Sequence, residues 1–243
     1  MNTLAPRPGK AIQQFSFVDA LVAGLLDGAF DAQDVAASGD FGVGCGDALD
    51  GELVLVDGEM FVCRGSGAVE RVPNDARLPF AEVTAFAPTF TREITEPIGE
   101  HDFELLVDSI VPSHNLFYAV RVDGDFEWVS VREAQRQSLP YPGLADAVKN
   151  QHESLIETTT GTLLGFKGPD VFQGLSVADY HLHYITADRQ LGGHSMDFVL
   201  TRGTLTIEAY ASFTVTLPQV ASYLDAELDD ISADEAIRQA ESS

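Results

Sequence analysis

The sequence predicts an α+β protein, mainly antiparallel and mixed β-sheets in two packed subdomains with a few short helices. Long stretches alternate apolar and polar residues at a period of two, which is typical of half-buried strands. Asp-Gly and Arg-Gly pairs separate several of these stretches, as they do in β-hairpins. Helical spacing or helix-start signals occur in only four short segments, so strands dominate the fold.

The helical segments are marked by capping signals and by apolar residues three or four positions apart. Ser16 and Asp19 have the spacing of a capping box, and Phe15 precedes them as in a hydrophobic staple. Ser232 and Glu235 repeat that spacing near the C-terminus, after an acidic stretch. The predicted helices cover residues 16–28, 103–111, 144–151 and a final segment that begins at Ser232.

The strand segments are separated by residue pairs that favour tight turns. Asp57-Gly58 supplies the positive φ angles of a type I′ turn and predicts a hairpin over residues 53–63. Asp123-Gly124 and Arg202-Gly203 predict two further hairpins. The other predicted strands lie within residues 116–132, 161–166, 180–186, 194–200 and 205–215.

An approximate domain boundary is predicted near Tyr141-Pro142-Gly143, because proline and glycine interrupt helices and strands. The chain has 243 residues, 45% of them hydrophobic, which suits one large domain or two small ones. We assign residues 1–147 to an N-terminal mixed β-sheet domain. Residues 148–243 then form an antiparallel β domain that carries a histidine cluster and the C-terminal tail.

The charge of the chain is strongly negative, with 14 Lys and Arg against 38 Asp and Glu and a net charge of −24. Such a surface repels nucleic acid and anionic lipid, so neither is expected as a partner. No apolar run approaches the roughly 18 residues of a membrane helix, and no secretory h-region is visible. A cytoplasmic location is therefore predicted. An anionic substrate would need a metal ion or a rare arginine to bind.

The two cysteines, Cys45 and Cys63, lie in apolar, strand-like surroundings. Two isolated cysteines make neither a disulfide framework nor a thiolate zinc site. We interpret both as small core residues.

Three histidines fall within fourteen residues of the C-terminal half. His181 and His183 are two apart on a predicted strand and therefore share one face. If the segment 186–193 folds back symmetrically, His183 lies directly opposite His194, within reach of a common ion. An H-x-H pair alone would suit structural or surface histidines equally well. Three imidazoles with an open position favour a catalytic zinc site, although iron, copper and nickel also accept such ligands.

The histidine block resembles a signature of the bacterial α-acetolactate decarboxylase family. Its core is Tyr180-His181-Leu182-His183-Tyr184, followed at family spacing by two shorter blocks, and further matches keep the family's order over most of the chain. These blocks are Asp188-Arg189, Gly192-Gly193-His194, Leu49-Asp50-Gly51-Glu52, Asn115-Leu116-Phe117-Tyr118-Ala119, Arg132 and Pro140-Tyr141-Pro142.

The resemblance implies a zinc enzyme that converts 2-acetolactate, a small anionic substrate, to acetoin and carbon dioxide. It implies Zn²⁺ as the cofactor and His181, His183 and His194 as its ligands. It also implies a homodimer. A cation beside the ketone and hydroxyl oxygens would stabilise the charge that develops when the carboxylate leaves. The chain accordingly shows no nucleotide or phosphate loop for another cofactor.

Three further site residues follow from the same resemblance. Glu52 matches a glutamate near the metal, and Arg132 matches an arginine that faces the substrate. A glutamate of the C-terminal tail folds onto the zinc in the family. Glu241 is the candidate for that role here, with Glu235 as the alternative. Which group delivers the proton to the product is left open by the sequence.

Two alternatives to the decarboxylase hypothesis remain. One is a zinc hydrolase that uses hydroxide on the metal, and the other is a non-catalytic protein that binds metal or ligand. One difference from the family pattern favours the non-catalytic alternative: this chain has Gly44-Cys45-Gly46 where the family has Gly-Thr-Phe. A carboxylate of Asp179 or Asp197 could orient the histidines.

Overall fold

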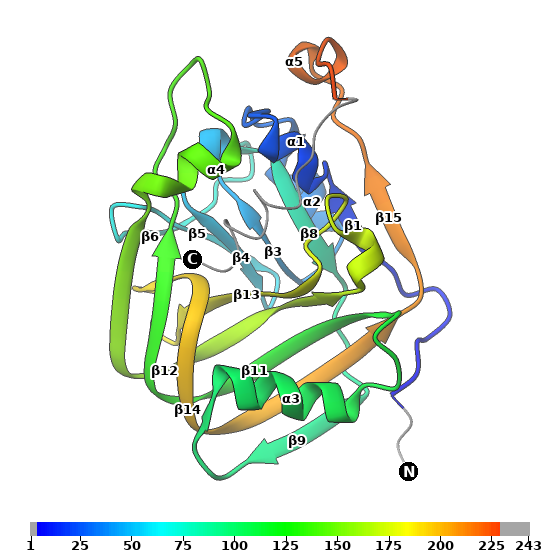
Figure 1. Cartoon of the computed structure of the whole chain (residues 1–243), viewed down its shortest axis with the longest axis vertical. Coiled ribbons are helices and arrows are strands. Elements are labelled where there is room, and N and C mark those ends of the chain that lie inside the picture. The colour runs from blue at the N-terminus through cyan, green and yellow to red at the C-terminus, as the bar shows by residue number, and fades with distance from the viewer. Residues whose placement is uncertain (1–3, 229–243) are drawn as a thin grey trace.

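The computed structural model describes residues 4–228, and Figure 1 shows that two β-sheets dominate the fold. The first sheet has seven strands, whose neighbours are antiparallel except for the parallel pair at one edge. In spatial order these strands are β15 (Phe213–Thr216), β1 (Ile12–Phe15), β8 (Phe80–Thr84), β3 (Phe41–Cys45), β4 (Glu52–Val56), β5 (Glu59–Cys63) and β6 (Val69–Arg71).

The second sheet has six strands, all antiparallel to their neighbours. The pairings β11–β12, β12–β13, β13–β14 and β14–β11 form a closed circuit. The six strands are β9 (Phe90–Ile94), β10 (Ile98–Gly99), β11 (Phe117–Glu133), β12 (His152–Gly168), β13 (Asp179–Thr186) and β14 (Gly192–Tyr210). Together the two sheets confirm the predicted fold class.

Short elements connect the sheets. They include the predicted helix at residues 144–151, which is confirmed as α4 and the 3-10 turn η2, and a two-stranded sheet of β2 and β7. No helix within residues 4–228 has the length and apolar character needed to cross a membrane. The predicted helix that begins at Ser232 lies outside the described residues. The connecting elements are α1 (Val18–Val22), β2 (Phe30–Asp31), α2 (Ala32–Ala37), η1 (Asp47–Leu49), β7 (Arg77–Leu78), α3 (Glu100–Ile110), α4 (Leu144–Ala147), η2 (Val148–Asn150), η3 (Asp170–Phe172) and α5 (Ala221–Leu224).

The strands of the second sheet come from both sides of the predicted domain boundary at residues 147/148. β11 precedes that boundary and pairs along its length with β12, which follows it. β15 follows the boundary and lies at the edge of the seven-stranded sheet, next to β1. The division of the chain into residues 1–147 and 148–243 stays a prediction.

The first helix is shorter than predicted, and the predicted capping box is wrong. α1 begins at Val18, Ser16 has a φ of 65°, and no side chain caps the helix. The amide of Asp19 instead donates to the carbonyl of Gly174 at 2.9 Å, and that of Val18 to the carbonyl of Leu175 at 3.3 Å. Because these carbonyls of a distant loop satisfy the free amides of the first turn, no capping side chain is needed.

The predicted hairpin at Asp57-Gly58 is confirmed. Asp57 has a φ of 53° and Gly58 a φ of 78°, the two left-handed positions that a type I′ turn requires. The turn joins β4 to β5 in the register Val56 opposite Glu59.

The other two predicted hairpins are wrong, because β11 and β14 run through Asp123-Gly124 and Arg202-Gly203 without turning. The two glycines lie opposite each other on these neighbouring strands. A Cβ on Gly124 would lie 2.5 Å from the carbonyl oxygen of Arg202. The glycines therefore permit a close approach of two bent strands, next to a bulge at residues 125/126.

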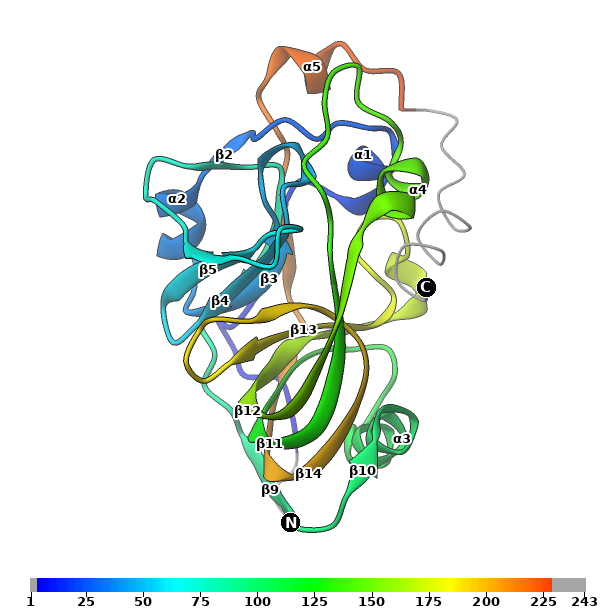
Figure 2. The same cartoon turned by 90° about the vertical axis from the view of Figure 1, so that its left-hand side faces the viewer.

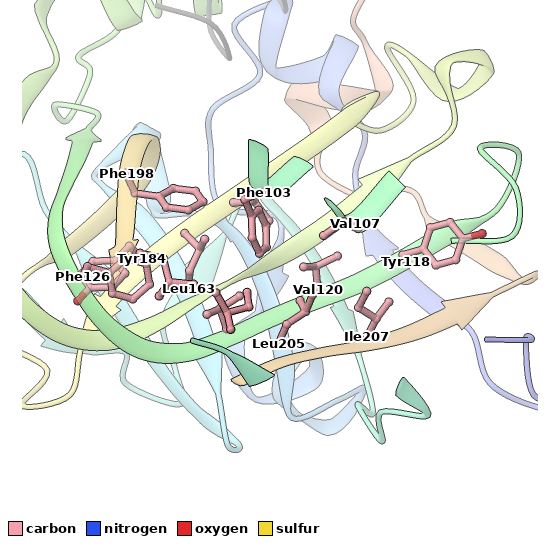
Figure 3. Close-up of a cluster of buried hydrophobic side chains, with 14 of the residues drawn as sticks. Phe103, Val107, Tyr118, Val120, Phe126, Leu163, Tyr184, Phe198, Leu205 and Ile207 are labelled. Carbon is pink, nitrogen blue, oxygen red and sulfur yellow. The ribbon is translucent and has the colours of Figure 1, made fainter. Parts of the chain in front are cut away.

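Helix α3 covers one face of the six-stranded sheet (Figure 1) and confirms the helix predicted at residues 103–111. Phe103 and Val107 point into a cluster of side chains from β11 and β14, including Val120 and Ile207 (Figure 3). The ring of Phe103 lies 5.4 Å from that of Phe198. Complete burial of one such phenylalanine contributes about 1.5–3 kcal/mol to the free energy of unfolding.

The opposite face of the six-stranded sheet packs against the seven-stranded sheet, as the side view shows (Figure 2). Phe41 of β3 meets Phe166 of β12, with ring centres 5.5 Å apart. Cys63 belongs to this apolar layer, and both Cys45 and Cys63 are buried free thiols, which confirms their interpretation as core residues.

A buried polar pair lies on neighbouring strands of the seven-stranded sheet. Gln14 of β1 and Glu82 of β8 are register partners, and both are almost completely buried. The hydroxyl of Ser176 donates to Glu82 Oε2 at 3.0 Å. Within the described residues, Oε1 of Glu82 and Oε1 of Gln14 have no hydrogen-bond partner. Burial raises the pKa of Glu82 from 4.5 to about 8, which the Ser176 hydrogen bond partly opposes.

The raised pKa of Glu82 makes the stability of the protein pH-dependent. The unfolded chain loses this proton near pH 4.5 and the folded chain near pH 8. The free energy of unfolding therefore falls as pH rises between these values, by a few kcal/mol, on the order of 1.4 kcal/mol per pH unit. Glu82→Gln should remove this slope in urea unfolding at pH 5 and pH 8. The exposed control Glu127→Gln should keep it. An unchanged slope in Glu82→Gln would show that Glu82 is ionised in the folded protein.

Candidate metal centre

Three histidines converge where β13 meets β14. His181 and His183 are two residues apart on β13, and His183 is the register partner of His194 on β14, as predicted from the sequence. The ring centres lie 5.0–5.3 Å apart. One nitrogen of each ring lies within 4.8 Å of the others, so the three could hold one metal ion.

The three imidazoles are buried, and burial lowers the pKa of two of them, His181 and His183, so that these two are neutral. His181, His183 and His194 are 7%, 0% and 4% exposed. Burial, helped by the nearby charge of Arg132, lowers the pKa of His181 to about 3. Burial and then the neighbouring His181 lower the pKa of His183 well below its ordinary range. Neutral imidazoles keep a free lone pair, which is the form that binds a metal.

A backbone carbonyl sets the orientation of His183. Its Nδ1 donates to the carbonyl oxygen of Leu53 on β4 at 2.8 Å, which leaves Nε2 as the nitrogen with a free lone pair. Within residues 4–228, neither this Nε2 nor Nδ1 of His181 has a hydrogen-bond partner. A buried nitrogen without a partner costs about 1–3 kcal/mol. The donor set therefore fits a metal ion that accepts these lone pairs.

Glu52 brings a carboxylate from the other sheet to the histidines. It is the first residue of β4, and its Oε2 lies 3.6 Å from Nε2 of His183. The side chain of Glu52 is 14% exposed and lines the same pocket as His181 and His194. The site is therefore assembled at the junction of the two sheets, with ligands from one and a carboxylate from the other.

Arg132 places a positive charge beside the histidines. It is the register partner of His194 and is only 4% exposed. Its Nη1 donates to Oε1 of Gln151 at 3.4 Å. With 14 Lys and Arg in a chain of net charge −24, a buried arginine in a pocket marks a place where an anion can bind.

The pocket in front of these residues has an empty volume of about 530 Å³, which extends to its open mouth. Most of the wall is apolar, and its residues come from segments that are far apart in sequence. The remaining lining residues are Val18, Leu21, Gly44, Cys45, Leu49, Phe80, Ala134, Leu144, Val148 and Val177.

The structure brings Glu52, Arg132 and the three histidines together, whereas Glu241 and Glu235 lie outside the described residues. The suggested carboxylates have other contacts. Asp179 pairs with Lys167, and Asp197 accepts from the amide of Phe198 at 2.7 Å. The role of the Leu53 carbonyl could not be predicted from the sequence, because every residue carries a backbone acceptor and none marks this one.

The segment Gly44-Cys45-Gly46 lies partly in the pocket wall. Gly44 and Cys45 line the pocket, and burial together with the nearby Glu52 raises the pKa of the Cys45 thiol well above its ordinary value. Cys45 is thus a neutral thiol, and it is the register partner of Glu52 across β3 and β4.

Known proteins resemble this chain along most of its length. The family model described as alpha-acetolactate decarboxylase matches residues 12–230. The alpha-acetolactate decarboxylase of Bacillus subtilis strain 168 is 38% identical over 224 residues, which cover 92% of this chain and 88% of the relative. That of Methylococcus capsulatus is 40% identical over 228 residues, which cover 94% and 87%.

Solved structures agree in fold. The crystal structure of alpha-acetolactate decarboxylase from Bacillus subtilis strain 168 has a TM-score of 0.93 at 38% identity and covers 96% of this chain and 100% of its own. A Staphylococcus aureus protein of unknown function, described as similar to alpha-acetolactate decarboxylase, has a TM-score of 0.92 at 27% identity, with 95% and 99% covered. The resemblance predicted from the histidine block is confirmed, and the chain belongs to the alpha-acetolactate decarboxylase family of enzymes.

Proposed function

We propose that this protein converts 2-acetolactate to acetoin and carbon dioxide with a zinc ion held by His181, His183 and His194. The observation that carries this proposal is the convergence of three buried imidazoles beside a pocket that the buried Arg132 also lines. The names of the relatives support the same substrate.

Zinc is the proposed ion because all three described ligands are imidazoles. Catalytic zinc sites commonly have three protein ligands and an open position. When bound, zinc supplies a Lewis acid that polarises the ketone and hydroxyl oxygens beside the bond that breaks. Glu241 remains a further candidate for the site, on the family resemblance alone.

Arg132 is proposed to hold the substrate carboxylate. A guanidinium stays charged throughout the physiological pH range and can donate two parallel hydrogen bonds to a carboxylate. Because Arg132 is almost fully buried, little water competes for these bonds. Its position beside His194 would place the carboxylate next to the metal site.

Glu52 is proposed to move the proton that completes the reaction. When carbon dioxide leaves, the electron pair of the broken carbon–carbon bond stays with the remaining carbon, which must then take up a proton to give acetoin. The Glu52 carboxyl lines the pocket, near Nε2 of His183. A carboxyl group that comes within hydrogen-bond reach of the reacting carbon can serve as a general acid.

The proposed activity is tested by measuring acetoin formed from racemic 2-acetolactate. The purified protein should produce acetoin, lose the activity in a chelator such as EDTA, and regain it when zinc is added back. A hydrolase that uses hydroxide on the metal would instead cleave a lactone or amide and release no acetoin. Absence of acetoin under every metal condition would contradict the proposal.

A homodimer and a cytoplasmic location remain predictions. Gel filtration with light scattering tests the first, and fractionation of cells that produce the protein tests the second.

A further inference from the structure

The turn that leads into Glu52 has a strained backbone. Ala48 has a φ of 56° and a ψ of 33°, and the next residue, Leu49, has a φ of 57°. Two consecutive left-handed residues other than glycine are unfavourable, because each Cβ crowds the backbone. Such a conformation persists only where its surroundings hold it in place.

Backbone hydrogen bonds fix the middle of this turn. The amide of Ala48 donates to the carbonyl of Leu26 at 2.8 Å, and the carbonyl of Ala48 accepts from the amide of Gln137 at 2.8 Å. The side chain of Asp47 accepts from the amide of Gly28 at 2.8 Å. The turn is thus held between two other segments, one of which continues from β11.

Arg136 joins the two acidic residues that flank the left-handed pair. Its Nη2 donates to Asp47 Oδ2 at 2.8 Å, and its Nη1 donates to the carbonyl of Asp47 at 3.3 Å and to Asp50 Oδ2 at 3.4 Å. Arg64 also donates to Asp50 Oδ2. One planar guanidinium therefore spans the turn, a geometry that a lysine ammonium cannot reproduce.

Arg136 also links the two charged residues of the pocket. It lies four residues after Arg132, where the chain leaves β11 of the six-stranded sheet. The turn that it grips ends at Gly51 and continues directly into Glu52 of the seven-stranded sheet. Leu49, inside the turn, lines the pocket as well.

We propose that Arg136 is a positioning residue, which fixes the Glu52 carboxylate relative to His183 and Arg132 by clamping the turn at Asp47 and Asp50. This inference rests on the proposed function of the site. It assigns no contact with substrate to Arg136, whose side chain is 56% exposed and is not among the residues that line the pocket.

A positioning role and a general structural role of Arg136 predict different effects on stability and on reaction rate. An ion pair as exposed as Arg136–Asp47 contributes little to the stability of the whole protein. A shift of about 1 Å in a reacting group can nevertheless slow a reaction by roughly 100-fold. Loss of Arg136 should therefore lower kcat strongly while it changes the unfolding temperature only slightly.

The test compares Arg136→Gln with wild type as zinc-loaded enzymes. We expect kcat to fall at least about 10-fold, with metal content unchanged and the unfolding temperature within about 2 °C. Arg136→Lys should recover only part of kcat. The matched control is Arg71→Gln, which removes an exposed ion pair with Glu59 at 3.0 Å and should leave kcat unchanged. A crystal structure of Arg136→Gln should show Glu52 Oε2 displaced from its 3.6 Å distance to His183 Nε2.

A double mutant decides whether Arg136 acts through Glu52. If it does, adding Arg136→Gln to Glu52→Gln should lower kcat by less than about twofold, because the group that it positions is already gone. A full additional 10-fold loss, or a wild-type kcat in Arg136→Gln alone, would overturn the positioning role while leaving the proposed function intact. A wild-type protein that forms no acetoin would overturn both.

Discussion

Replacement of His183 by alanine is expected to abolish metal binding and acetoin formation together. His183 is completely buried, and its free Nε2 faces the other histidines and Glu52. Loss of a group that merely supports a metal ligand usually costs 10–100-fold, so loss of a ligand should cost about 1,000-fold or more. Metal content by mass spectrometry and acetoin formation should fall in parallel.

The control for this change is His114→Ala, which removes an exposed histidine outside the site. It should keep both zinc and activity. Because a buried side chain is deleted in His183→Ala, its unfolding temperature should be compared with that of the metal-free wild type. A His183→Ala protein that folds, binds zinc as the wild type does and forms acetoin would contradict the ligand assignment.

Replacement of Arg132 by alanine is expected to leave the zinc in place and lower kcat by about 100-fold or more. Arg132 is not one of the three residues that could hold the ion, so its removal does not deprive the metal of a ligand. The variant lacks the guanidinium that would bind and orient the substrate carboxylate, so the reaction is slower. Zinc content and kcat should therefore separate in this variant, unlike in His183→Ala.

Arg132→Lys tests the geometry of this contact. A lysine keeps the charge but not the planar pair of donors, so it should recover a small part of the activity. If Arg132→Ala lost zinc to the same extent as His183→Ala, the division of roles between the two residues would be wrong.

Structural features that depend on neighbours in the chain can be predicted from this sequence. Asp57-Gly58 gives a type I′ turn because both residues accept positive φ, whatever surrounds them. His183 lies opposite His194 because the short segment between β13 and β14 and the period of the strands together set the register. The resemblance of the histidine block likewise depended on residues close together in sequence.

The same kind of local signal failed where distant segments compete for it. Gly124 and Gly203 sit in residue pairs that favour turns, yet they face each other across two continuous strands. Ser16 has the spacing of a cap, but carbonyls of the loop at residues 174–175 bind the amides of α1. A glycine can lie in a turn or in a strand, and a serine can cap a helix or leave it uncapped. The contacts with the neighbouring strand or loop decide between these conformations.

By itself, the sequence determined the fold class, the family and the three histidines on one face, since strand periodicity and short spacings are encoded along the chain. The tertiary structure alone decided how the site is completed. Glu52 reaches His183 from the other sheet, and the Leu53 carbonyl sets the orientation of the His183 ring. Contacts between segments more than 100 residues apart depend on how the two sheets pack, which no local pattern of residues specifies.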